Sequence, residues 1–139
     1  MKTSVYNNFP DCAKAIREAV FINEQGFQQE FDEIDNTATH FVLFDDDKIP
    51  VATCRVFWNT AINEYVLGRL AVMKEYRGKN IGSAIVNEAE KYVCEKGGTG
   101  IALHAQCRVA DFYKKIGFTE FGDIEDEQGC PHIWMKKSL

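Results

Sequence analysis

Residues 77–83, Arg-Gly-Lys-Asn-Ile-Gly-Ser, combine two cations with two glycines shortly after an apolar run. Glycines at a strand-to-helix turn let the backbone come close to a ligand. The first N–H groups of a helix have no partner within it and carry the positive end of its dipole. Such a turn can bind phosphate, with Arg77 and Lys79 adding charge. The alternative is a structural turn that only begins a helix.

Two common nucleotide-binding motifs do not fit this segment. A P-loop needs G-x-x-x-x-G-K-[ST], but Gly78 and Gly82 lack that spacing and no G-K-[ST] follows. The dinucleotide fingerprint G-x-G-x-x-G is also absent. A phosphate site here would therefore be of another type.

A few other side chains could transfer protons. A tyrosine can protonate a leaving group, and histidine or glutamate can accept a proton. Tyr113 is one candidate, although its apolar neighbours at helical spacing favour a place in the core. His104 lies inside an apolar strand, where a lone histidine is more often structural. Glu24 and Glu33 are further acid–base candidates.

The apolar pattern predicts the order β-α-β-β-β-α-β-α-β-β. The expected strands are residues 3–7, 39–45, 50–58, 65–73, 101–105, 118–124 and 132–137, and the expected helices are 10–25, 81–93 and 109–116. A helix joins strand 65–73 to strand 101–105, so these two should be parallel, whereas the early hairpins should be antiparallel. The acidic stretch 26–38 is expected to be a loop with one helical turn. These elements predict a mixed sheet with helices on its faces.

Composition narrows the class of protein. The chain has 139 residues, enough for a single domain over 1–139. Its net charge of −5 gives no general support for a nucleic-acid or anionic-membrane partner. No apolar stretch approaches the roughly 18 residues that span a membrane, and no signal peptide is recognisable. The scattered cysteines and histidines lack metal-ligand spacing, so we expect no metal, reduced thiols and a cytoplasmic location.

The segment 77–83 also resembles a known motif. GCN5-related N-acetyltransferases (the GNAT family) carry R/Q-x-x-G-x-G/A after their fourth strand. Asn80 stands here where that family usually has glycine, and asparagine tolerates positive φ well. The segments GRLAVMKEYRGKNIG and FYKKIGF are similar to two further family signatures. REAVFINEQGF and PHIWM resemble a bacterial subgroup of small, mostly uncharacterised acetyltransferases.

The resemblance implies a fold and a cosubstrate. The fold would be α/β, a GNAT-type mixed sheet of about six to seven strands, splayed at its centre and flanked by helices. Acetyl-CoA would lie with its pyrophosphate on the turn and its pantetheine arm along the fourth strand. The implied cofactor-binding residues are Leu70, Ala71, Val72, Arg77, Gly78, Lys79, Asn80, Ile81, Gly82, Ser83, Cys107 and Ala110. Cys107 stands where many relatives have asparagine.

The same resemblance makes Tyr113 the candidate general acid for the departing thiolate. Arg69, His104 and Glu24 are the other catalytic candidates. Arg69 could orient an anionic substrate group or pair with a carboxylate. The general base is not identified, because Val66 occupies the place where relatives often have glutamate. A water chain is an alternative base.

The implied activity is transfer of an acetyl group to an amine of a small molecule or peptide, by direct attack in a ternary complex. An acetyl-CoA sensor without turnover is the alternative, and an acyl-homoserine-lactone-synthase-like acyltransferase ranks below both. Segments 24–38 and 122–131 are expected to be loops that shape the acceptor pocket. The acidic residues of the first suggest either a cationic acceptor or, in preference, a solvated loop. A homodimer would be ordinary for the family.

Overall fold

The computed structural model describes residues 1–28 and 30–139. The elements are β1 (Lys2–Tyr6), α1 (Asp11–Arg17), η1 (Glu18–Glu24), η2 (Glu33–Asn36), β2 (Thr39–Phe44), β3 (Pro50–Asn59), β4 (Glu64–Val72), η3 (Lys74–Tyr76), α2 (Ile81–Glu95), β5 (Gly100–Gln106), η4 (Cys107–Val109), α3 (Ala110–Lys115), β6 (Thr119–Glu127) and β7 (Cys130–Ser138). This order confirms the predicted succession of strands and helices. The helical turn expected in the acidic stretch is η2.

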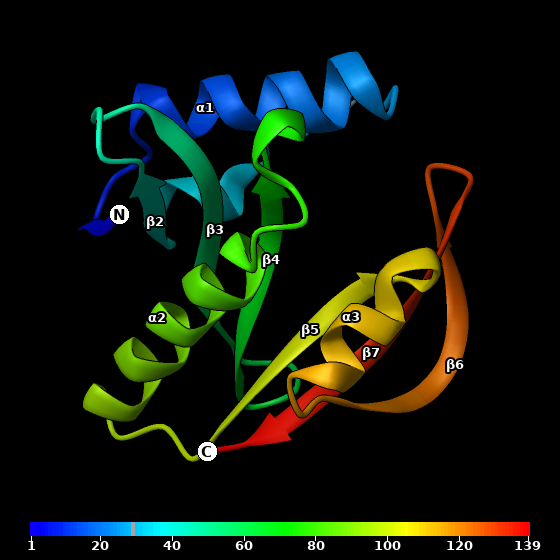
Figure 1. Cartoon of the computed structure of the whole chain (residues 1–139). Coiled ribbons are helices and arrows are strands. Elements are labelled where there is room, and N and C mark those ends of the chain that lie inside the picture. Colours follow the sequence, from blue (N-terminus) through cyan, green and yellow to red (C-terminus); the bar gives the residue numbers. More distant parts are fainter. Residues whose placement is uncertain (29) are drawn as a thin grey trace.

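The described strands form one seven-stranded sheet in the order β1-β2-β3-β4-β5-β7-β6 (Figure 1). Neighbouring strands are antiparallel except β4 and β5, which are parallel, as the α2 crossover predicts. The β4–β5 pairing covers only Tyr65–Leu67 against Ile101–Leu103. Beyond these residues the two strands diverge (Figure 1). The fold is therefore the predicted mixed α/β sheet, splayed at its centre.

Helices cover both faces of this sheet. On one face, α1 and η1 bury Ile16, Val20 and Phe21 in an apolar cluster with Val42 and Ala71. On the other face, α2 and α3 pack over the larger cluster. Burial of a large apolar side chain contributes about 1.5–3 kcal/mol, so these clusters hold the diverging strands in place.

The sequence of α2 explains its position. Its buried residues are Ile81, Ile85, Val86, Ala89 and Val93, which form one stripe at helical spacing. Gly97 follows with φ 82°, the left-handed conformation that commonly ends a helix. The stripe fixes α2 against the sheet and thereby fixes its N-terminus beside β4.

No helix in the described residues is long and apolar enough to cross a membrane.

The first predicted helix differs from the expectation in its second half. The α-helix ends at Arg17, and η1 continues as a π-helix in which the Gln25 N–H donates to the Val20 carbonyl at 3.0 Å. A π-helical turn is wider than an α-helical one and is frequent near functional sites. The apolar spacing alone did not distinguish the two helix types.

The last hairpin also differs, because segment 122–131 is not a loop. Strand β6 runs to Glu127 and β7 begins at Cys130, so the segment is an extended two-stranded ribbon. Gln128 and Gly129 form its tip with φ 51° and 78°. Two successive positive φ values are typical of a tight hairpin turn that matches strand twist. Asn-Gly is the usual signal for this turn, and Gln-Gly was not recognised as one.

Candidate active site

A cavity of about 380 Å³ lies where β4 and β5 diverge. Its lining comes from β4, β5, the segment after η1 and the β6–β7 ribbon. A neighbouring hollow of about 720 Å³ shares Gln106 and Arg108 with it and extends to Glu24. The divergence of two strands thus creates a cavity in the middle of the sheet.

The β4 wall carries a backbone irregularity. Arg69 has φ 53°, and the β3–β4 register shifts around it, so β4 bulges at this point. On one edge β4 resumes its pairing with β3 at Ala71 and Val72. On the other edge its pairing with β5 has already ended at Leu67. The strand therefore presents an edge without a neighbouring strand beside the cavity, and Leu70 lines the cavity there.

The Arg77–Ser83 turn has the backbone that its sequence requires. Gly78 has φ 79° and Asn80 has φ 61°, so the asparagine adopts the positive φ expected of a glycine position. Asn80 is followed directly by α2, with no side-chain cap on the helix. The first N–H groups of α2 therefore lack a capping side chain. Gly82 lies under the Phe112 ring, where an added Cβ would come 3.1 Å from Cζ.

The cations of this turn have partners. Arg77 donates from both terminal nitrogens to the Glu24 carboxylate, at 2.6 and 2.7 Å, and from Nε to the Val72 carbonyl at 3.0 Å. The hydrogen bonds from Arg77 to the Glu24 carboxylate lower the pKa of Glu24. Lys79 lies over the Tyr76 ring, with Nζ 5.4 Å from the ring centroid. Glu24 thus lies at the turn, bound to Arg77.

A second set of charges lies on the β3–β4 side of the cavity, and we call it the arginine–carboxylate network. Its members are Arg17, Arg55, Arg69, Glu30, Asp32 and Asp35. The arginines come from α1, β3 and β4, whereas all the carboxylates come from the segment between η1 and β2. Glu30 and Asp35 are buried. The preferred expectation of a solvated acidic loop is therefore wrong for Glu30 and Asp35, whereas Asp32 and Glu33 are exposed as expected.

Arg17 is the most deeply buried member, with 1% of its side chain exposed. It donates to Asp35 from both terminal nitrogens, at 2.7 and 3.0 Å, and from Nε to Glu30 at 3.0 Å. Burial would raise the pKa of Asp35, but hydrogen bonds from Arg17, the Asp32 N–H and Arg55 outweigh it and lower the value to about 2. For Glu30 burial prevails and raises the pKa.

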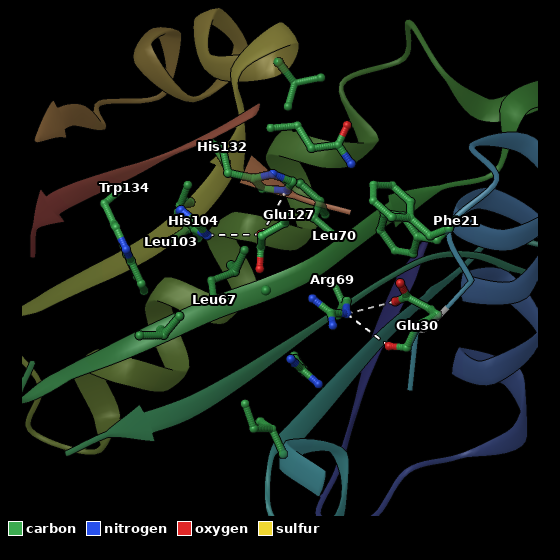
Figure 2. Close-up of a pocket in the computed structure, with 18 of the residues that line it drawn as sticks. Phe21, Glu30, Leu67, Arg69, Leu70, Leu103, His104, Glu127, His132 and Trp134 are labelled. Atoms are coloured by element: carbon green, nitrogen blue, oxygen red, sulfur yellow. Dashed lines mark hydrogen bonds and ion pairs between the residues drawn. The ribbon is translucent and has the colours of Figure 1, made fainter. Parts of the chain in front are cut away.

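Arg69 belongs to this network in the described structure. Its Nε lies 3.0 Å from Glu30 Oε1 (Figure 2). Its Nη2 lies 3.3 Å from Asp32 Oδ2. Of its two expected roles, the ion pair with carboxylates is therefore observed. The arginine also lines the cavity, with 30% of its side chain exposed. The acceptor-binding role stays a prediction.

Tyr113 reaches the cavity from α3. Its ring packs edge-on against Phe112 and Phe118, with centroids 5.0 and 5.8 Å away, and it is buried. No other described residue forms a hydrogen bond with its hydroxyl group. Burial raises its pKa, so the phenol keeps its proton at neutral pH. Tyr113 is therefore part of the core, as the periodicity predicts, and also lines the cavity, while its role as general acid stays a prediction.

His104 is not a lone histidine, because it faces two side chains of the ribbon. Its Nδ1 lies 3.1 Å from Glu127 Oε2, and His132 Nε2 lies 3.2 Å from the same oxygen (Figure 2). Trp134 stacks on His104 with centroids 4.9 Å apart. We call His104, Glu127 and His132 the histidine–glutamate cluster. In the described part of the chain, no three His, Cys, Asp or Glu side chains are arranged to hold a metal ion.

The remaining expected cofactor residues lie on β4, on the first turn of α2 and at the starts of η4 and α3. Cys107 begins η4 and Ala110 begins α3, while Ala71 is buried under α1. Ile81 is also buried, whereas Ser83 is partly exposed on the first turn of α2. The turn, β4 and the start of α3 thus carry the expected cofactor set.

Sequence reasoning missed Glu127, His132 and most of the arginine–carboxylate network. Glu127 comes next to His104 only through the antiparallel pairing of β7 with both β5 and β6. The tight Gln-Gly turn would have fixed that register, since it places Glu127 opposite Cys130. No comparable local signal exists for Arg17, because its partners are 13 and 18 residues away.

Comparison with known proteins agrees with this geometry. The family model described as acetyltransferase (GNAT) domain matches residues 10–139. The uncharacterized N-acetyltransferase YjcF of Bacillus subtilis is 34% identical over 125 residues, which cover 88% of this chain and 87% of the relative.

Solved structures show the same fold. Escherichia coli ElaA has a TM-score of 0.85 at 24% identity, with 98% of each chain covered. An aminoglycoside 6′-N-acetyltransferase complexed with coenzyme A has a TM-score of 0.78 at 19% identity, covering 99% of this chain and 97% of that one. At these identities the likeness concerns the fold alone. On the family match and the Bacillus relative, this chain belongs to the GNAT family of acyl-CoA-dependent acetyltransferases.

Proposed function

We propose that this protein transfers the acetyl group of acetyl-CoA to an amine of a small molecule or peptide. The amine attacks the thioester directly while both substrates are bound. The observation that carries the proposal is the free edge of β4 beside the cavity, which continues into the turn that begins α2. One edge can pair with an amide-containing arm while the turn binds the phosphates at its end.

The backbone of β4 suits the pantetheine arm. Pairing with β5 ends at Leu67, so the peptide groups from Gly68 to Val72 have no partner strand on that side among the described residues. An extended ligand with its own amides can add there as an extra strand. A main-chain N–H near Leu70 would then polarise the thioester carbonyl, and such a donor is typically worth about 3 kcal/mol in the transition state.

The turn suits the pyrophosphate. The uncapped N–H groups at the start of α2 attract an anion, and Gly78 leaves open space beside the backbone. Arg77 and Lys79 supply positive charge, although Arg77 is already paired with Glu24. The phosphates would therefore compete with or join that ion pair.

Direct transfer is favoured over an acyl-enzyme route by the placement of the thiols. Among the described residues no cysteine lines the 380 Å³ cavity. Cys54 is buried, and burial raises its pKa, so it is a poor nucleophile. In this proposal Tyr113, which lines the cavity, protonates the departing thiolate.

A matched pair of variants tests the cofactor site. Ser83→Glu places a carboxylate in the first turn of α2, where it favours the helix but repels a phosphate. Asn87→Glu makes the same change of charge one turn further along. We expect acetyl-CoA affinity, measured by calorimetry, to fall about tenfold or more for Ser83→Glu, or about 1.4 kcal/mol, and to change less than about twofold for Asn87→Glu.

Turnover is then measured as thiol release over a panel of primary amines. Equal acetyl-CoA affinities in the two variants would contradict the proposal that the pyrophosphate binds at the turn. Acetyl-CoA binding without turnover of any amine would instead favour a sensor that has kept the cofactor cleft. Thiol release that needs an amine, with one acetylated product per thiol, supports the proposal.

A further inference from the structure

The hydrogen-bond partners in the histidine–glutamate cluster indicate which ring nitrogen of His132 carries a proton. His132 Nδ1 lies 2.8 Å from the Cys130 carbonyl oxygen, which can only accept a hydrogen bond. Nδ1 must therefore carry its proton whether the ring is neutral or charged. The other ring nitrogen, Nε2, lies 3.2 Å from Glu127 Oε2.

A neutral His132 therefore turns a lone pair toward a carboxylate. The same Oε2 is 3.1 Å from His104 Nδ1, which can donate to it. His104 Nε2 is buried without a hydrogen bond, and Glu125 Oε1 is 3.4 Å away. With both rings neutral and Glu127 ionised, the contact between Oε2 and His132 Nε2 lacks one proton, and the cluster has a net charge of −1.

This position is suited to receive a proton from a substrate. Glu127 and both histidines line the cavity, and half of the Glu127 side chain is exposed. The cluster lies apart from Arg69 and Glu30 of the arginine–carboxylate network (Figure 2). A negative cluster on the cavity wall attracts an ammonium group, and the Trp134 ring beside it offers a further cation-binding surface.

We infer that Glu127 is the general base of this protein, with His132 and His104 as its positioning residues. The inference rests on the proposed function and names a base for it. The ammonium N–H bond breaks and its proton goes to Glu127, where the Oε2–H faces His132 Nε2. The amine lone pair then forms the N–C bond, and the C–S bond breaks. Tyr113 gives its proton to the thiolate and takes the second proton of the attacking nitrogen in its place. Glu127 then releases the first proton to water.

Other charged groups lie near the cluster. Glu125 Oε1 on β6 is 3.4 Å from His104 Nε2. Asp126 on β6 and Arg108 on η4 act electrostatically on Cys130, whose carbonyl oxygen binds His132. The three arginines and three carboxylates across the cavity balance one another in charge. A test therefore compares single substitutions within the cluster with one on the same ribbon outside it.

Three variants make this comparison. Glu127→Gln keeps the shape and removes the charge. His132→Asn keeps a donor for the Cys130 carbonyl and removes Nε2. Asp123→Asn makes the same charge change on β6, and Asp123 has no described contact with the cluster. We expect kcat/KM for an acetylated amine to fall about 10²-fold for Glu127→Gln, while acetyl-CoA affinity changes less than about twofold.

The pH profile separates a base from a structural group. The wild-type and Asp123→Asn proteins should show a rising limb of kcat/KM with pH, and this limb should move by about one unit or vanish in Glu127→Gln and His132→Asn. An unchanged rate and limb in both cluster variants would overturn the inference. If Glu127→Gln does not fold, the His132→Asn profile decides.

Imidazole ¹⁵N NMR gives a readout without turnover. We expect His132 Nδ1 to stay protonated across the titration while Nε2 gains and loses its proton, at lower pH in Glu127→Gln than in the wild type. The opposite tautomer, or an unmoved titration, contradicts the assignment. If acetyl-CoA binds but no amine is acetylated, the proposed function fails and the role of Glu127 as a base fails with it, even where the NMR result holds. Active enzyme with the wrong tautomer overturns this inference alone.

Discussion

The charged residues of the Arg77–Ser83 turn lie within one short segment of the chain. The arginine–carboxylate network instead combines side chains from α1, β3, β4 and the segment before β2. The turn depends on backbone conformation, with positive φ at Gly78 and Asn80. The network depends on hydrogen bonds in or near the interior, four of which end on the buried Asp35 carboxylate. We therefore expect substitutions in the turn to lower the free energy of unfolding less than removal of one partner from the buried network.

The largest expected effect comes from removing the central cation of the network. Arg17→Met keeps much of the side-chain length but removes the shortest partner of Asp35 and one of the two arginines that contact the Glu30 carboxylate. Loss of one partner from a buried ion pair typically costs about 3–5 kcal/mol. We expect the free energy of unfolding, from urea denaturation at pH 7, to fall by about that amount.

Lys14→Met is the matched control, on the same helix. Lys14 is exposed and lies 3.8 Å from an exposed Asp11, so its loss should change stability by less than about 0.5 kcal/mol. Similar losses in the two variants would mean that the network contributes no more than a surface pair.

Tyr113→Phe is the opposite case, because it removes a hydroxyl group that has no described hydrogen-bond partner from a side chain lining the cavity. Since no partner is left unsatisfied, stability should change by less than about 1 kcal/mol. If the hydroxyl protonates the thiolate, kcat should fall about 10²-fold with acetyl-CoA affinity nearly unchanged. Thermal unfolding and steady-state kinetics on one preparation measure both. A destabilised but fully active protein would remove Tyr113 from the mechanism.

The network should also determine how stability depends on pH. The pKa of Asp35 is about 2 in the folded protein against an ordinary 3.8, so its contribution is complete above about pH 4 and is lost as the pH falls toward 2. The loss amounts to about 2 kcal/mol. Glu30, whose pKa is raised by burial, acts in the opposite direction, because its ionisation costs stability as the pH rises above 4.5.

Urea denaturation between pH 5 and pH 2.5 tests this dependence in the wild type and in Asp35→Asn. The asparagine variant should be less stable at pH 5 and should lose less on acidification. The Ser83→Glu variant, whose new carboxylate is on the exposed turn, should follow the wild type. Equal slopes for Asp35→Asn and the wild type would assign the acid sensitivity to other carboxylates.

The contrast between the two regions also explains what the sequence could predict. The βαβ crossover, the stripe of α2 and the positive φ of Asn80 are encoded by residues close together in the chain, and the structure confirms all three. The burial of Glu30 and Asp35 was not predictable, because it depends on which arginines the folded sheet brings to them. Charge in a sequence does not reveal whether it will be solvated or paired.

The same limit applies to the candidate base. His104 was visible as a polar residue in an apolar strand, but its partners come from a ribbon whose register depends on the turn at Gln128 and Gly129. Glu127, in a run of acidic residues, had no feature that set it apart. A single slipped residue would turn its side chain to the opposite face of the ribbon.

The smallest expected effect lies at Asn80, where the local turn can be tested without touching any buried charge. Asn80→Gly removes the side chain from a residue at φ 61° and relieves the strain of the left-handed conformation, but it also adds freedom to the unfolded chain. These terms oppose one another, so we expect thermal stability to change by less than about 0.5 kcal/mol. Asn80→Ala should cost about 1 kcal/mol, since alanine tolerates this conformation less well than asparagine. Acetyl-CoA affinity should stay the same or rise in the glycine variant, because the turn then matches the usual family pattern. Weaker binding by Asn80→Gly would show that the asparagine side chain itself contacts the cofactor.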